Sequence, residues 1–118
     1  MADQIPAANR RLVYERSSGH CERCCMTTTV PHLHHRRPKG LGGSSAPDRH
    51  AVSNLAHLCP TCHMEVHANP RMSAEDGWIV PRSSGLAPAA VPVVNLLGSS
   101  AWLSDDGQYL LEVAADAQ

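Results

Sequence analysis

Residues 21–67 decide how this chain folds, and they carry three motifs in order: CERC at 21–24, LHHRRP at 33–38 and SNLAHLCPTCHMEVH at 53–67. Two pairs of cysteines, each with two residues between its members, supply four thiolates. These cysteines are Cys21, Cys24, Cys59 and Cys62. Four cysteines in two such knuckles are the ligand set of a closed structural zinc site. We therefore expect one zinc ion to join the two ends of this stretch.

Histidines are interleaved with the cysteines. His63 and His67 stand four positions apart on a helix expected over residues 61–68, so their imidazoles should project from one face. Two further histidines, His34 and His35, lie between the cysteine pairs. Because four sulfur atoms complete one zinc ion, these histidines remain available for a different task.

The order of these residues resembles that of the HNH endonucleases, whose catalytic unit is the ββα-metal (His-Me) finger. The resemblance covers residues 10–70 and rests on the His34–His35 pair, on Asn54, and on the run that ends with His63 and His67. Asn54 precedes His63 by nine positions and His63 precedes His67 by four, which is the usual order and spacing in the family.

The resemblance implies a role for each of these residues. It makes His34, His63 and His67 the ligands of a catalytic divalent ion. It makes His35 the general base that activates water, and Asn54 the residue that holds this base in position. The family often has Asp where this chain has His34. Three imidazoles favour Zn²⁺, Ni²⁺, Co²⁺ or Mn²⁺ over Mg²⁺, although substrate oxygen atoms could still recruit Mg²⁺.

The expected fold is a small α+β domain, in which a short helix over residues 5–17 precedes the ββα-metal finger and its paired knuckles. We expect residues 1–72 to form the nuclease domain and residues 73–118 a β-rich extension packed on it. The first strand of the finger is expected over residues 27–33 and the second over residues 54–58. Four further strands are expected over residues 78–80, 91–97, 101–103 and 109–113, with a hairpin turn at 105–108 and with Trp78 and Trp102 as apolar anchors.

Basic residues gather in the first half of the chain. Residues 1–50 hold eight Lys or Arg and four acidic residues, a net charge of +4, whereas residues 51–118 have a net charge of −5. Arg36, Arg37 and Lys39 follow the histidine pair directly and open a Gly-, Ser- and Pro-rich loop. We expect these three residues to contact nucleic-acid phosphates, although an ordinary solvated surface would carry the same charges.

The remaining histidines and the fifth cysteine have less specific interpretations. His32 would share one strand face with His34, because side chains alternate along a strand. His20 and His50 are expected to be exposed to solvent. His57 is expected to be a buried, hydrogen-bonded ring, or else a nucleic-acid contact. Cys25 is expected to be a spare thiol beside the first knuckle, although it could instead replace Cys24 as a ligand.

Length and composition narrow the class of protein. A chain of 118 residues with no Phe, two Trp and two Tyr has few large core residues, so a structural metal would help to hold it together. The odd number of cysteines and the lack of an apolar N-terminal segment argue for reduced thiols and a cytoplasmic location, in the host cell if a phage encodes the protein. A membrane-spanning segment is not expected, and a monomer is favoured.

The function expected from the resemblance is metal-dependent hydrolysis of DNA phosphodiester bonds, by nicking or by cutting both strands. A second hypothesis is a zinc-ribbon module that binds nucleic acid or protein without catalysis. A third hypothesis places the chain in a phage DNA-packaging assembly with terminase proteins as partners, because small HNH proteins of this build occur in phages and actinobacteria.

Overall fold

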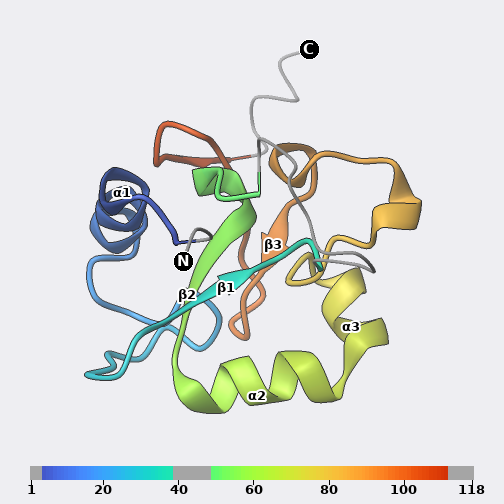
Figure 1. The fold of residues 1–118 in the computed structure, drawn as a ribbon. Helices are drawn as coiled ribbons and strands as arrows, with labels where there is room; N and C mark the ends of the chain where they lie inside the picture. Colours follow the sequence, from blue (N-terminus) through green and yellow to red (C-terminus); the bar gives the residue numbers. More distant parts are fainter. Residues whose placement is uncertain (1–3, 39–48, 112–118) are drawn as a thin grey trace.

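The structure is a computed structural model that describes residues 4–38 and 49–111. These residues form a small α+β protein with three α-helices and two small antiparallel sheets (Figure 1). Every helix among them is too short or too polar to cross a membrane. In chain order the elements are α1 (Ala7–Ser17), β1 (His32–His35), η1 (Val52–Asn54), β2 (Leu55–Leu58), α2 (Pro60–Ala68), α3 (Pro70–Glu75), η2 (Arg82–Ser84), η3 (Pro88–Ala90), β3 (Val93–Val94), β4 (Ser100–Leu103) and β5 (Tyr109–Leu110).

Helix α1 confirms the helix expected near the N-terminus, although it begins two residues later than predicted. Pro6 stands at its start, where a missing N–H group costs no helical hydrogen bond. The helix ends where Ser18 and Gly19 adopt positive φ angles of 53° and 80°. On its buried side, Val13 packs with Val52 and Leu55 in a small apolar cluster.

Strands β1 and β2 form an antiparallel pair, in which His34 lies opposite Ala56 and His35 opposite Leu55. The first strand expected over residues 27–33 is wrong for most of its length, because β1 begins at His32. Pro31 directly precedes it and has no N–H group to donate to a neighbouring strand. Both histidines therefore lie inside β1, where neighbouring side chains face opposite sides.

Helix α2 follows β2 after one residue and lies against both β1 and β2 (Figure 1). Its start is well defined, because Pro60 occupies the first turn and the Cys59 side chain accepts a hydrogen bond from the Cys62 N–H group. The helix ends at Ala68, Asn69 caps it, and α3 begins at Pro70. The expected helix over residues 61–68 is thus confirmed.

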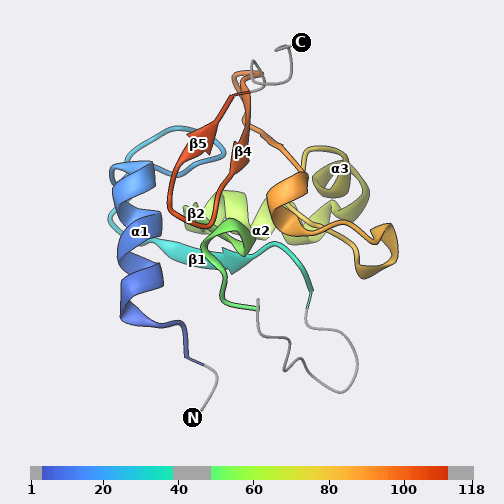
Figure 2. The same ribbon diagram turned by 90° about the horizontal axis from the view of Figure 1, so that it is seen from above.

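The C-terminal part is less strand-rich than expected. β3, β4 and β5 form one antiparallel sheet in that order, but Trp78–Val80 is not a strand. The strand expected over 91–97 is reduced to Val93–Val94, and the last strand ends at Leu110 within the described residues. The expected hairpin turn is present, with Gly107 at φ +84°, and it lies beside α1 (Figure 2).

One apolar core includes residues from the segment before α3 and from the segment after it. Trp78 is buried in it, and its indole Nε1–H donates to the Val94 carbonyl oxygen at 3.0 Å. Trp102, the second expected anchor, is only half-buried. The other members of this core are Cys21, Ala56, Leu58, Cys62, Val66, Val93 and Leu103.

Arg36 corrects a prediction, because it does not lie on the surface. Its exposed fraction is 0%, and its guanidinium donates four hydrogen bonds to main-chain carbonyl oxygens. The acceptors belong to Gly77, Ser53, Pro88 and Val91, at 2.9, 2.8, 3.0 and 2.6 Å. Arg36 therefore joins the end of β1 to the C-terminal segments and cannot contact a nucleic-acid phosphate in this fold.

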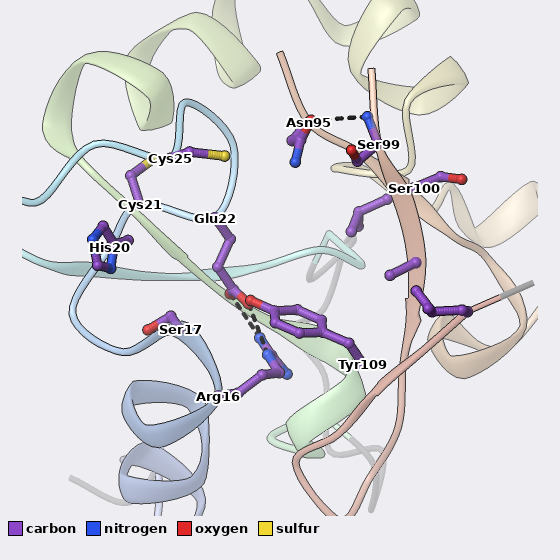
Figure 3. A pocket seen from close by; sticks show the side chains of 13 residues that line it. Arg16, Ser17, His20, Cys21, Glu22, Cys25, Asn95, Ser99, Ser100 and Tyr109 are labelled. Atoms are coloured by element: carbon purple, nitrogen blue, oxygen red, sulfur yellow. Dashed lines mark hydrogen bonds and ion pairs between the residues drawn. The ribbon is translucent and has the colours of Figure 1, made fainter. Parts of the chain in front are cut away.

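A buried ion pair lines a pocket of about 390 Å³ between the first knuckle and the C-terminal sheet (Figure 3). The Arg16 guanidinium donates to both carboxylate oxygens of Glu22, each at 2.7 Å. The Tyr109 hydroxyl donates to Glu22 Oε2 at 2.5 Å. Because Tyr109 belongs to β5, this bond connects the C-terminal sheet to the loop that carries the first knuckle.

Candidate metal centres

Four cysteines come together where the first knuckle meets the start of α2. Cys21, Cys24, Cys59 and Cys62 each offer a sulfur atom, and these atoms all lie within 4.8 Å of one another. The N–H groups of Cys24 and Cys62 point at the sulfur atoms of Cys21 and Cys59, at 3.5 and 3.4 Å. A zinc ion with bonds of about 2.3 Å would separate its sulfur ligands by about 3.8 Å, so the cluster fits a four-cysteine zinc site.

The electrostatics of the cluster also favour a cation. Burial raises the pKa of the Cys21 thiol, but hydrogen bonds from main-chain N–H groups outweigh this effect, so its pKa lies below the ordinary value. Burial raises the pKa of Cys62, and the neighbouring Cys21 thiolate raises it further. The cluster alone therefore disfavours a thiolate at Cys62 beside that of Cys21, whereas a divalent cation would stabilise both.

Cys25 stands outside this set, as expected. All five cysteines are free of disulfide bonds, but the four-sulfur cluster includes Cys24 and not Cys25. Cys25 adopts a φ angle of +68°, a left-handed conformation that is uncommon for residues other than glycine.

Three histidines form a second cluster. His34 comes from β1, His63 and His67 come from α2, and each offers a ring nitrogen within 4.8 Å of the other two. The Nε2 atoms of His63 and His67 are 3.2 Å apart. One ion with bonds of about 2.0–2.1 Å in tetrahedral geometry would hold two such nitrogens about 3.3 Å apart. The residues present therefore fit a shared divalent ion.

The surroundings of His34 keep its ring in a form that can bind a metal ion. Its Nε2 lies 2.7 Å from the Trp78 carbonyl oxygen, which can only accept, so Nε2 carries the hydrogen. The neutral ring therefore presents its lone pair at Nδ1. Burial lowers the pKa of His34 to about 4, so the ring is neutral near pH 7. A metal-binding histidine usually has such a partner on its other nitrogen.

His32 also reaches this cluster, on the same side of β1 as His34. Its Nδ1 lies 2.9 Å from Nδ1 of His63. The rings meet edge to face, with centroids 5.0 Å apart and planes at 79°. The prediction that His32 and His34 share a strand face is confirmed.

His35 lies on the other side of the strand, next to His50. Its Nε2 is 3.0 Å from Nδ1 of His50, and the ring centroids are 5.1 Å apart. The expectation that His50 is exposed is wrong, because the residue is half-buried and its carbonyl oxygen accepts a hydrogen bond from Asn9 at 2.7 Å. Sequence reasoning missed this pairing because 14 residues separate the two histidines along the chain.

Asn54 is buried and holds the main chain just beyond His35. Its Oδ1 accepts from the Arg37 N–H group at 2.9 Å, and its carbonyl oxygen accepts from the Arg36 N–H group at 2.8 Å. Its Nδ2 donates to the Arg49 carbonyl oxygen at 2.8 Å. One amide side chain thus connects the end of β1 to the segment that carries His50.

The other residues predicted to contact nucleic acid differ in their exposure and in their hydrogen bonds. Arg37 is half-buried, and its Nη2 donates to the Leu86 carbonyl oxygen. Lys39 lies outside the described residues. His57 is buried and its Nδ1 lies 2.8 Å from Ser17 Oγ, which confirms a buried, hydrogen-bonded ring.

The chain was compared with models of protein families, with curated proteins and with solved structures, and none of the three comparisons returned a match.

Proposed function

We propose that this protein is a metal-dependent endonuclease of the HNH type, which hydrolyses phosphodiester bonds in DNA. The observation that carries the proposal is the cluster of His34, His63 and His67, with His35 beside it on β1 and facing another way. A protein that used only a structural zinc ion would have no need for a second set of convergent ligands.

The arrangement of elements supports the same proposal. β1 and β2 are antiparallel, and α2 lies against both, as in a ββα-metal finger. The four-cysteine cluster brings together the first knuckle and the start of α2. In this proposal, zinc in that cluster stabilises the small domain and leaves the histidines to bind the catalytic ion.

The residues of the chain would divide the chemistry between them. A divalent ion bound by His34, His63 and His67 would neutralise charge on the scissile phosphate and stabilise the leaving oxygen. The imidazole of His35 would take a proton from the attacking water. Asn54 would hold the main chain beyond His35 through the Arg37 N–H group, and so fix the position of the base.

The direct test is nicking of supercoiled plasmid by zinc-loaded protein with Mn²⁺, Ni²⁺, Co²⁺ or Mg²⁺ added. Wild-type protein should cut with at least one of these ions, and His35→Ala should reduce the rate by about 10²-fold or more, while leaving metal binding intact. His20→Ala is the matched control, because His20 is an exposed histidine. Intact plasmid with every ion, or equal cutting by His35→Ala, would refute the proposal. Retention of DNA binding without cutting would favour a zinc-stabilised binding module instead.

A further inference from the structure

His32 makes one contact that the proposed chemistry does not use. Its Nδ1 lies 2.9 Å from Nδ1 of His63, which is hydrogen-bond distance between two ring nitrogens. His63 has its other nitrogen, Nε2, 3.2 Å from Nε2 of His67. The two nitrogens of His63 therefore face two different neighbours.

These contacts determine which tautomer of His63 suits metal binding. If Nε2 of His63 presents its lone pair to an ion shared with His67, the hydrogen of the neutral ring must be on Nδ1. The Nδ1–H group then donates to Nδ1 of His32, which is the acceptor. His34 receives equivalent support from the Trp78 carbonyl oxygen at 2.7 Å.

We infer that His32 is a positioning residue for the metal ligand His63, and that it holds the ring in the tautomer and orientation that bind a divalent ion through Nε2. This inference rests on the metal site of the proposed function. His32 itself is not a ligand, because it does not belong to the set of nitrogens that converge within 4.8 Å.

The fold explains why this contact forms. His32 and His34 are two positions apart on β1, so both face the side on which α2 lies. His63 is in the first half of α2, where its ring lies between those of His32 and His67, with centroids 5.0 and 4.9 Å away. Neither His32 nor His63 is fully buried, so a substitution at position 32 should leave the core intact.

The test measures Co²⁺ affinity in protein whose four-cysteine site already holds zinc. His32→Ala should weaken binding by about 10–100-fold, the usual effect of losing a hydrogen-bond partner behind a metal ligand. His32→Asn should restore most of the affinity, because its Oδ1 can accept at the position of the histidine Nδ1. His20→Ala should bind as wild type, and His67→Ala, which removes a ligand, should abolish tight binding. The visible bands of Co²⁺ bound to His32→Ala should keep their wild-type energies, because the same three nitrogens remain ligands.

Two results would overturn the inference: affinity in His32→Ala equal to that in His20→Ala, or Co²⁺ bands shifted as expected for a lost nitrogen ligand. A second measurement tests the proposed tautomer of His63 even if no second ion binds. Ring ¹⁵N spectra should show the hydrogen of His63 on Nδ1 in wild type and a mixture of tautomers in His32→Ala, whereas a hydrogen on Nε2 in wild type would contradict us. Normal Co²⁺ binding without DNA cleavage would refute the nuclease and not this inference.

Discussion

Replacement of Arg36 with alanine should lower the free energy of unfolding and leave the charge of the protein surface almost unchanged. The guanidinium is fully buried and donates four hydrogen bonds to main-chain carbonyl oxygens. The carbonyl groups come from the segments around residues 53, 77 and 88–91, so one side chain holds three other parts of the chain together. Burial lowers the pKa of Arg36 to about 10, and the group is still charged near pH 7.

The hydrogen bonds of Arg36 determine how much the free energy of unfolding should fall. A hydrogen bond from a charged donor contributes about 1.5–3 kcal/mol, so the four bonds together contribute about 6–12 kcal/mol before opposing terms. Burial of the guanidinium opposes this by several kcal/mol, and water can enter the space that alanine leaves. We expect a net loss of about 3–5 kcal/mol for Arg36→Ala. Arg36→Lys should lose about 2 kcal/mol, because an ammonium group is a compact charge that cannot reach all four carbonyl groups.

Chemical denaturation of the zinc-loaded protein, followed by circular dichroism, measures both losses. Arg11→Ala is the matched control, because Arg11 is an exposed residue of α1, and it should change the free energy by no more than about 0.5 kcal/mol. Thermal unfolding of Arg36→Ala should begin about 10 °C or more below wild type. If Arg36→Ala unfolds like the control but binds DNA more weakly, Arg36 is a surface residue and this reasoning is wrong.

Three further predictions concern the zinc site, the proposed base and the Glu22 network. Cys59→Ser, or prolonged chelation, should release zinc and abolish the helical circular dichroism signal; an unchanged spectrum after zinc loss would contradict the structural role. His50→Ala should slow plasmid nicking about tenfold without weakening metal binding, because His50 holds the ring of His35; equal nicking rates would refute this. Burial and the Glu22 carboxylate raise the pKa of Tyr109. The hydrogen bond from Tyr109 to Glu22 therefore stabilises the fold fully below the pKa of an unfolded tyrosine, about 10, and this contribution declines at higher pH. In denaturation experiments Tyr109→Phe should therefore be less stable than wild type at neutral pH, and its free energy of unfolding should fall less than that of wild type between pH 9 and 11. Equal falls in the two proteins would count against the network.

The parts of the fold that were predictable from the sequence depend on local spacing. Two residues between the cysteines of each pair are enough to define a knuckle, and both knuckles join one cluster. The spacing of four positions from His63 to His67 places both rings on one side of α2. Pro60 lies in the first turn of that helix, where proline costs no helical hydrogen bond.

The parts that were mispredicted depend on contacts between distant segments. Arg36 follows a histidine pair and opens a Gly-rich loop, which is typical of an exposed basic residue. Only the folded chain brings carbonyl groups from residues 53–91 around it. The apolar Trp78–Val80 segment has the composition of a strand, but its first side chain fills the core and no strand forms there.

In the candidate site, too, some residues were predictable from the sequence and others depend on contacts between distant segments. The resemblance supplied His34, His63 and His67, and the fold brings their ring nitrogens together. No local signal pairs His35 with His50, because the segment between them must fold back first.

The central claim is that sulfur ligands and imidazole ligands hold two separate ions in one small domain. Native mass spectrometry of the protein in excess Zn²⁺ or Co²⁺ tests it most directly, with wild type compared to the His63→Ala and His67→Ala double variant. We predict that wild type carries two ions and that the double variant carries one and remains folded. One ion in both proteins would contradict the account.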